Sequence, residues 1–248
     1  MLDGETPSLR SAWERHAEEW VAWARTPGHD TYWHFHRDRF LALVPPPGRL
    51  TLDVGCGEGR LGRDLVAAGH RLVGVDGSPT MAHASATHPE RPLDAIVSDA
   101  AALPVASEVA DCVVAFMSLQ DIDDLEGSVR ELARVLRPGG CLAVAIVHPA
   151  NSAGRVVGAR GDPARPFVIT GSWFERRRYS DAVARDGLTM TFHSEHRPLQ
   201  AYVDAAVDAG LMIDRLNEIN DPDPADAWHR MPMFLHLRAR KPEALGAT

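Results

Sequence analysis

The chain has 248 residues and a formal net charge of −8 at pH 7; 45% of its residues are hydrophobic and 24% are charged. This length suits one large α/β domain or a core domain with a cap, and the apolar fraction disfavours disorder over most of the chain. The negative charge disfavours broad, sequence-independent binding to nucleic acid, which needs a basic surface.

The cysteines indicate a reducing environment. Cys56, Cys112 and Cys141 each lie in or beside a predicted buried strand, and none has C-x-x-C spacing. The sequence therefore suggests neither a disulfide framework nor a zinc site, and we expect no metal. No apolar segment follows Met1 and no apolar run reaches membrane-spanning length, which predicts a cytoplasmic protein without a signal peptide. Lys241 is the only lysine, a bias that hints at a GC-rich bacterial genome.

Residues 1–46 are predicted to form a helical cap. Ser11 and Glu14 have capping-box spacing, and apolar residues recur at intervals of three and four up to Ala24. A second helix is expected over 30–44, ended by the proline run at 45–47. This segment is crowded with aromatic and histidine side chains, which either pack within the cap or form a lid over a ligand site. Tyr32, Trp33 and His36 are its candidate substrate contacts.

Strands and helices alternate through the core, residues 47–148. We expect strands at about 50–54, 71–76, 95–98, 111–116 and 141–147, with helices at about 59–68, 79–87 and 124–136. Ser78 followed by Pro79 marks the start of the second of these helices. Continuous apolar strands in such an alternation predict a parallel sheet covered on both faces.

The alternation of strands and helices stops at residues 149–187, where no long periodic element is expected. An insertion of this length is usually functional or disordered. Within it, Arg176–Arg178 either meet an acidic acceptor or form a solvated face, and Trp173 either walls a pocket or pins a loop. Residues 188–248 complete the sheet, with a strand over 188–195, a helix over 198–210 and an antiparallel pair of strands at about 211–218 and 233–240.

The segment from Leu50 to Arg60 points to a ligand site. A buried strand ends near Asp53, and Gly55, Gly57 and Gly59 follow at alternate positions before a helix. Glycine allows a tight turn and close approach of a ligand to the backbone. The first amides of the next helix then face that ligand. This layout predicts a nucleotide-type site on a doubly wound sheet.

The glycines also satisfy G-x-G-x-x-G, so a dinucleotide-dependent dehydrogenase must be weighed. Asp53 would repel a pyrophosphate, whereas it suits a ligand with an ammonium group. Asp76 is placed to accept hydrogen bonds from ribose hydroxyls, which fits either cofactor. Asp99 ends the third strand, where it can accept from the exocyclic amine of adenine.

Together these segments resemble the class I S-adenosylmethionine-dependent methyltransferases. The resemblance spans 50–147 and includes Asp53–Gly59, Val75–Pro79, Ser98–Pro104, Asp111–Phe116 and Leu136–Gly140. It implies a seven-stranded, mostly parallel sheet with an antiparallel last strand, and S-adenosylmethionine as cofactor with S-adenosylhomocysteine as product. It places Asp53 near the methionine part, Asp76 at the ribose diol, Asp99 and Ala100 at adenine, and Met81 on the adenine ring. The other cofactor contacts that it implies are Gly55, Cys56, Gly57, Gly77, Ser78, Met117 and Ser118.

Methyl transfer requires an aligned acceptor, and oxygen or protonated nitrogen acceptors often need a base. Many small-molecule relatives have a histidine pair near Gln120 and Asp121, and both are replaced here. Gln120 could orient an acceptor, while Asp121 could be a base or a helix cap. The candidate bases are His148, which ends the fifth strand, followed by His193, His36 and Asp121.

We therefore expect methyl transfer to an O, N or C atom of a small molecule, with secondary metabolism as one setting. A non-methylating cyclase or sensor that retains the cofactor, or an RNA methyltransferase, is the alternative. The N-terminal helices and residues 149–187 would form the substrate cap. We expect a monomer or homodimer with no membrane partner, and we consider nucleic acid an improbable one because of the net charge.

Overall fold

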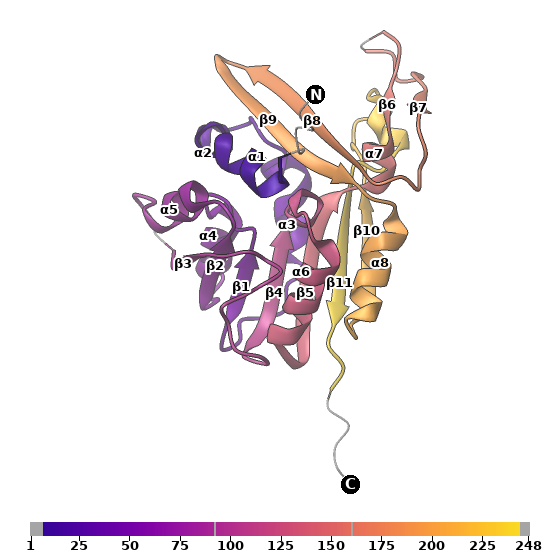
Figure 1. The fold of residues 1–248 in the computed structure, drawn as a ribbon. Helices are drawn as coiled ribbons and strands as arrows, with labels where there is room; N and C mark the ends of the chain where they lie inside the picture. The colour runs from indigo at the N-terminus through magenta and orange to yellow at the C-terminus, as the bar shows by residue number, and fades with distance from the viewer. Residues whose placement is uncertain (1–6, 92, 160, 244–248) are drawn as a thin grey trace, which may run out of the picture.

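The computed structural model describes residues 7–91, 93–159 and 161–243. Its centre is a seven-stranded sheet with the order β10-β11-β5-β4-β1-β2-β3 (Figure 1). Strand β11 runs antiparallel to both of its neighbours, and the remaining strands are parallel. The seven strands are β1 (Thr51–Val54), β2 (Leu72–Asp76), β3 (Ala95–Val97), β4 (Ala110–Phe116), β5 (Leu136–Val147), β10 (Met212–Ile219) and β11 (Phe234–Arg240). The predicted doubly wound sheet with an antiparallel last strand is confirmed.

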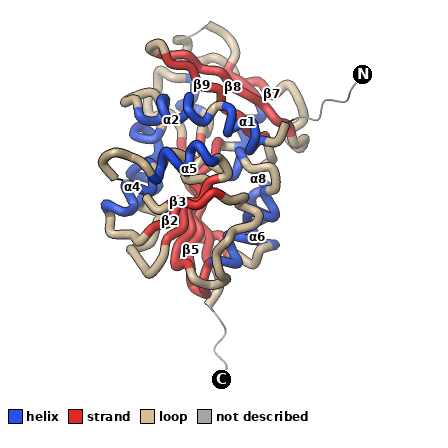
Figure 2. The backbone as a smooth tube through the Cα atoms, turned by 60° about the vertical axis from the view of Figure 1, so that its left-hand side comes forward, coloured by secondary structure: helices blue, strands red, loops and turns tan. Residues whose placement is uncertain are grey.

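The cap begins with α1 (Leu9–Arg15) and α2 (Ala17–Arg25), which lie between α5 (Pro79–Ala86) and the strands β8 and β9 (Figure 2). The predicted start of α1 is wrong, because the Ser8 hydroxyl caps it by accepting from the amide of Ser11 at 3.1 Å. The second predicted helix is shorter than expected. It opens with the π-helical turn η1 (Tyr32–His36), continues as α3 (Arg37–Leu41), and ends before the prolines.

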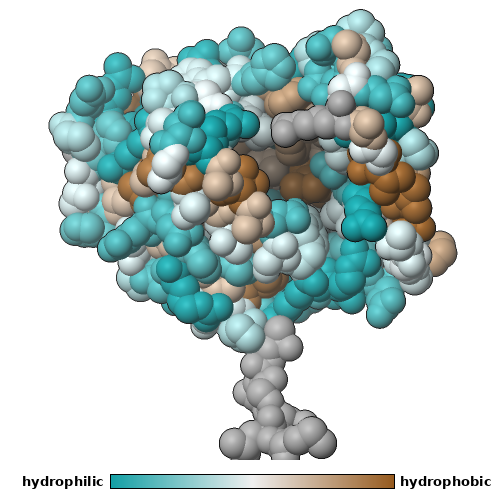
Figure 3. Space-filling model, turned by 90° about the horizontal axis from the view of Figure 1, so that it is seen from above, coloured by the Kyte–Doolittle hydropathy of each residue, from teal (hydrophilic) through white to brown (hydrophobic). Residues whose placement is uncertain are grey.

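Residues 149–196 contain more structure than the sequence predicts. They form α7 (Pro149–Ala153), the strand pair β6 (Gly154–Val156) and β7 (Phe167–Ile169), and the hairpin of β8 (Arg177–Arg185) with β9 (Leu188–His196). Positive φ angles of 50° at Asp186 and 80° at Gly187 form the tight hairpin turn. Seen from above, the molecule is mostly hydrophilic but has a hollow with hydrophobic walls (Figure 3).

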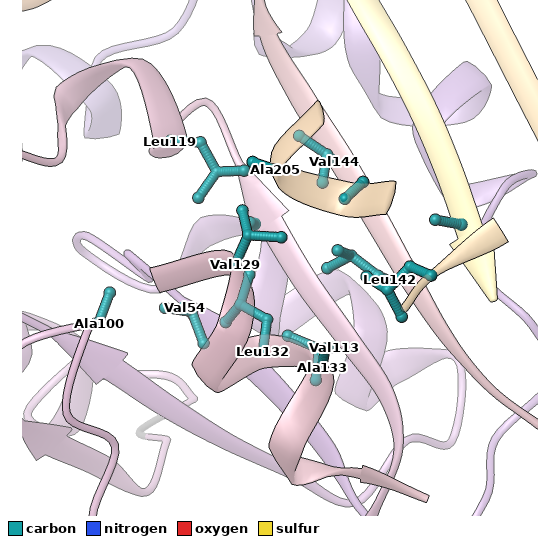
Figure 4. Close-up of a cluster of buried hydrophobic side chains, with 14 of the residues drawn as sticks. Val54, Ala100, Val113, Leu119, Val129, Leu132, Ala133, Leu142, Val144 and Ala205 are labelled. Carbon is teal, nitrogen blue, oxygen red and sulfur yellow. The ribbon is translucent and has the colours of Figure 1, made fainter. Parts of the chain in front are cut away.

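Helices cover both faces of the sheet. On one face, α6 (Leu125–Val135) and α8 (Leu199–Asp208) bury the apolar cluster that includes Leu132, Val113 and Leu142 (Figure 4). On the other face, α4 (Arg60–Ala67) and the cap bury Leu65, Phe40 and their neighbours. The short helices η2 (Leu119–Asp121) and η3 (Ala227–Arg230) lie in the connections after β4 and β10. Within the described ranges, no helix is long and apolar enough to cross a membrane.

Asp111 links the amino ends of β1, β4 and β5, which lie at the end of these strands opposite the ligand site. Its carboxylate accepts from the amide of Leu50 at 3.0 Å, from the amide of Arg49, and from Arg137 Nε at 2.5 Å. Burial alone would raise its pKa, but the hydrogen bonds from Arg137 and the two amides outweigh burial and lower the pKa of Asp111.

We predict that Asp111→Asn lowers the free energy of unfolding by about 1–2 kcal/mol at pH 7. Because the folded-state pKa is depressed, the carboxylate stabilises the fold above the unfolded-state pKa and loses this effect as the pH falls through the folded-state value. The difference from wild type should therefore shrink below about pH 4. Urea unfolding at several pH values measures it, with the exposed Asp94→Asn as control. A difference independent of pH would contradict the assignment.

Candidate functional site

A cavity of about 780 Å³ lies at the carboxyl ends of β1, β2 and β4, beneath the hairpin β8–β9. Helices α1 and α2, which lie beside the hairpin (Figure 1), line it with Arg10, Trp13, Trp20 and Trp23. Every residue that the sequence assigns to the cofactor lines this cavity: Asp53, Gly55, Cys56, Gly57, Asp76, Gly77, Ser78, Met81, Asp99, Ala100, Met117 and Ser118. The cavity therefore joins segments that are far apart in the sequence.

The glycine loop turns with positive φ angles of 75° at Gly55, 56° at Gly57 and 88° at Gly59. A Cβ atom at Gly55 would lie 2.3 Å from the Cβ of Ser118. Ser118 in turn donates from Oγ to the carbonyl oxygen of Val54 at 2.8 Å. Glycine is thus required at position 55 both by backbone conformation and by the close approach of the loop that follows β4.

Asp76 holds the glycine loop against the start of α5. Its Oδ2 accepts from the amide of Gly57 and its Oδ1 accepts from the amide of Ser78, both at 2.8 Å. Burial raises the pKa of Asp76, while these two amides partly offset the effect. Ser78 caps α5 as predicted, because its Oγ accepts from the amide of Met81 at 3.1 Å. A carboxylate oxygen can accept more than one hydrogen bond, so Asp76 can still bind hydroxyl groups in the cavity.

Asp53 is a buried carboxyl group whose charge has no partner among the described residues. Its side chain is 1% exposed, and no donor in the described part of the chain reaches its Oδ2. Burial, and then the nearby charge of Asp76, raise the pKa of Asp53 to about 7. A buried charge without a partner is costly. A cationic ligand would relieve this cost, so the residues present fit a ligand with a positive charge beside the glycine loop.

Asp99 lies after β3 at the rim of the cavity, where its Oδ1 accepts from the amide of Ala101 at 2.9 Å. Asp99 is exposed, whereas Ala100 beside it is buried. The pair thus offers a hydrogen-bond acceptor next to an apolar surface. This arrangement suits the polar edge and the apolar face of a flat heterocycle.

Helix α1 closes over the loop that follows β2. Arg10 Nε donates to the carbonyl oxygen of Gly77 at 2.8 Å, and Glu14 accepts from Thr80 Oγ1 at 2.7 Å and from Ser78 Oγ. At the amino end of α1, the amide of Leu9 donates to Asp123 at 3.0 Å. The sequence predicts the lid but not these contacts, because the spacing of Glu14 resembles a local helix cap.

The structure does not bring the predicted histidine bases to the cavity. His148 caps α7 by accepting from the amide of Ala150 at 3.0 Å, and its Nε2 lies 3.1 Å from Glu218 Oε1. Burial lowers the pKa of His148, and Glu218 partly offsets this. His193 contacts Ser180 Oγ at 2.8 Å and does not line the cavity.

His36 is also outside the cavity. It is 1% exposed, and its Nδ1 lies 2.9 Å from Nε2 of His236. Burial, followed by the neighbouring His236, lowers the pKa of His36. The ring packs 5.2 Å from Phe116 and thus supports the cavity wall from behind.

Two predicted aromatic contacts lie elsewhere as well. Trp33 is 60% exposed, with the guanidinium of Arg37 5.3 Å from its ring. Trp173 packs 6.0 Å from His196 and pins the loop before β8. By contrast, Tyr32, Gln120 and Asp121 do line the cavity, as expected for residues that meet a substrate.

Asp121 is half-buried at the end of η2. It accepts from Ser194 Oγ at 2.6 Å through Oδ1 and from Gln120 Nε2 at 3.1 Å through Oδ2. Burial raises the pKa of Asp121 well above its usual range, although Ser194 and the charge of Arg197 partly offset this. Asp121 is therefore suited to exchange a proton with a molecule in the cavity.

Several lining residues were missed by sequence reasoning. Arg60, the first residue of α4, forms an ion pair with Asp30 and lies 4.4 Å from the ring of Tyr32. Burial lowers the pKa of Arg60 to about 9. The aromatic wall also contains Trp13, Trp20, Trp23, Phe116, Tyr179, Phe192 and Phe234. The crowding of tryptophans at 13–23 was a usable signal for part of this wall.

Comparison with known proteins agrees with this geometry. The family model described as "Methyltransferase domain" matches residues 52–144. Demethylmenaquinone methyltransferase of Mycobacterium marinum is 37% identical over 117 residues, which cover 47% of this chain and 48% of that protein. The chain thus spans about half the length of the curated relatives it matches.

Over residues 52–144 the chain is thus similar to a methyltransferase domain. The crystal structure of an S-adenosylmethionine-dependent methyltransferase from Mesorhizobium loti has the same fold, with a TM-score of 0.68 at 23% identity over 85% of this chain and 98% of that one. The [4+2]-cyclase SpnF also has it, with a TM-score of 0.63 at 18% identity over 96% and 98%. The family model covers the loops that contain the predicted cofactor contacts. It ends at residue 144, before the hairpin β8–β9, and so does not cover the upper wall of the cavity.

We predict that Asp53→Asn stabilises the ligand-free protein more at pH 8 than at pH 5. The raised folded-state pKa means that wild type loses stability as the pH rises from the unfolded-state value, about 3.9, towards about 7. Asparagine removes this ionisation and keeps the shape of the side chain. Thermal unfolding across this range measures the effect, and a difference that stays constant with pH would show that the folded structure does not raise the pKa of Asp53.

Proposed function

We propose that this protein transfers a methyl group from S-adenosylmethionine to a small molecule held beneath the hairpin β8–β9. The observation that carries the proposal is the buried, unpaired carboxyl of Asp53 beside a glycine loop, in the same cavity as Asp76 and an aromatic wall. The bound cofactor supplies an electrophilic methyl group on a cationic sulfur. This chain's residues must bind, orient and shield the reactants.

The cofactor half of the cavity supports specific roles. Asp53 would balance the positive charge of the methionine part, and the fixed carboxylate of Asp76 would accept from the ribose diol. Asp99 and Ala100 would hold adenine, with Met81 packed against the ring. Gly55, Cys56, Gly57 and Gly77 would let the ligand approach the backbone, and Ser78, Met117 and Ser118 would shape the adjoining loops.

The acceptor half is closed by α1, α2 and the hairpin, which would exclude water during the transfer. Asp121 is the side chain we propose as the proton acceptor, because it lines the cavity and its environment raises its pKa. Gln120 would fix Asp121 and orient the acceptor. Tyr32 would form part of the wall.

A small-molecule acceptor is supported by the cavity beneath the hairpin and by relatives named demethylmenaquinone methyltransferase. Those relatives match over about half their length, so their acceptor is not assigned to this chain. The net charge of −8 disfavours RNA. The three free cysteines and the relatives' mycobacterial sources fit a cytoplasmic bacterial enzyme.

We predict that Asp76→Ala weakens S-adenosylmethionine binding by about 1.5–3 kcal/mol, because charged hydrogen bonds are lost. Calorimetric titration measures this. In parallel, the wild-type protein should move an isotopically labelled methyl group from the cofactor into small molecules of a bacterial extract, and the variant should need more cofactor to do so.

The outcomes of these assays separate the alternatives. Cofactor binding with no transfer of label to any small molecule favours the cyclase or sensor, and label recovered in RNA favours the RNA enzyme. Unchanged affinity in Asp76→Ala would show that the ribose assignment is wrong.

We predict that Asp121→Asn lowers the transfer rate about 100-fold or more while cofactor affinity stays within about twofold, since general base catalysis contributes on this order. The wild-type rate should rise with pH as Asp121 loses its proton. Ser194→Ala is the informative comparison: it keeps the base but removes a donor that favours the carboxylate, so the midpoint of its pH profile should move upward. If the Asp121→Asn variant keeps the wild-type pH profile, Asp121 is not the proton acceptor.

A further inference from the structure

The wall of the cavity opposite the glycine loop is formed by one face of β8. Alternate residues of the strand line the cavity: Arg177, Tyr179, Asp181, Val183 and Arg185. Successive side chains of a strand point to opposite faces, so this pattern shows a single face turned inward over the full length of β8. Strand β8 is thus a lining element, although most of its residues are exposed to solvent.

The arginine run at 176–178 is divided between two environments. Arg176 pairs with Glu126, and Arg178 pairs with Asp123 at 2.6 Å. Arg177 lies between them, lines the cavity, and donates from Nη2 to the carbonyl oxygen of Ser152 at 3.2 Å. The outer arginines therefore attach the strand, whereas no carboxylate in the described residues lies within 4.0 Å of Arg177.

Arg155 of β6 lines the same end of the cavity. Ser152, which accepts from Arg177, also lines the cavity close to Arg155 in the chain. No ion pair or hydrogen bond of the Arg155 side chain is found within the part of the chain that the structure describes. Arg185, at the other end of β8, is used differently, because it donates to the carbonyl oxygen of Gly28 at 2.7 Å and so secures the cap.

The two arginines without a carboxylate partner and the buried acid beside the glycine loop lie on different elements of the cavity lining. Asp53 and Asp76 lie beside the glycine loop, where Arg60 is paired with Asp30, whereas Arg155 and Arg177 lie near the base of the hairpin without a carboxylate partner in the described residues. Asp121 lies closer to the hairpin, where it accepts from Ser194 Oγ of β9. Aromatic rings line the space between, among them Trp20 and Phe192 with centroids 6.0 Å apart. Asp181 is the acidic side chain on the inner face of β8, and no arginine lies within 4.0 Å of it in the described residues.

We propose that the acceptor is a flat, apolar molecule with an acidic group, and that Arg155 and Arg177 hold this group while the opposite end of the molecule faces the glycine loop. This assignment rests on the proposed function. The guanidinium fork matches planar oxyanions such as carboxylates, which an ammonium group does not. The buried carboxyl groups of Asp53 and Asp76 disfavour an anion beside the glycine loop, which favours the orientation with the acidic group at Arg155 and Arg177.

The test uses two fluorescent probes that differ in one group. 8-Anilinonaphthalene-1-sulfonate is a flat, apolar anion, and N-phenyl-1-naphthylamine has the same ring system without the sulfonate. Energy transfer from the tryptophans of the cavity wall reports binding in the cavity. Titrations are made with and without S-adenosylhomocysteine, at low and high salt.

We predict that the sulfonate binds about tenfold more tightly than the neutral probe at low salt, and that this preference falls as salt rises. The double variant Arg155→Gln/Arg177→Gln should lose the preference while its affinity for the neutral probe is unchanged. The control Arg91→Gln/Arg215→Gln removes the same charge from exposed arginines outside the cavity and should behave as wild type.

Equal affinities for the two probes, a preference that survives in the Arg155/Arg177 variant, or no binding of either probe would overturn the proposal. These readouts need no methyl transfer. If the protein binds the anionic probe as predicted but transfers no labelled methyl group, the proposed function is contradicted. The proposed anion site would still stand in that case.

Discussion

The carboxyl group of Asp53 at the end of β1 imposes the main constraint on this molecule. It is buried, its Oδ2 has no partner in the described chain, and the charge of Asp76 adds to the cost of ionising it. Beside this carboxyl group the chain turns through glycines, and Asp76 fixes the turn by accepting from the amide of Gly57. Such a buried, perturbed acid in a cavity is typical of a site built for a ligand.

Most of this floor could be predicted from sequence, because its determinants are local. The apolar strand, the glycines at 55, 57 and 59, and the cap of α5 by Ser78 all lie between residues 50 and 81. Each depends on backbone conformation or on hydrogen bonds to near neighbours. The strand order then follows from the usual connections of a doubly wound sheet. The strand ends were therefore predictable to within one residue, except that β5 begins at Leu136 and not at the predicted residue 141.

The upper wall could not be predicted in the same way. Strand β8 is exposed along most of its length, so it lacks the apolar alternation by which strands are usually found. The prediction that a histidine acts as the base was wrong for a related reason. His148 is engaged by Glu218, and His36 by His236, partners 70 and 200 residues away in the chain. A histidine near a strand end is as well suited to capping or packing as to catalysis, and only the fold distinguishes these uses.

The two halves of the cavity are nevertheless mechanically joined. Arg197, at the end of β9, is 1% exposed; it pairs with Glu195 and donates to the carbonyl oxygens of Leu119 at 3.0 Å and Ile122 at 2.6 Å. It therefore fixes the segment that carries Asp121 to the base of the hairpin that carries Arg177. Because the glycine loop depends on local backbone and the wall depends on the buried contacts of Arg197, the cavity-facing side chains of β8 can change without disturbing the glycine loop. The position of Asp121 relative to that wall, however, depends on Arg197.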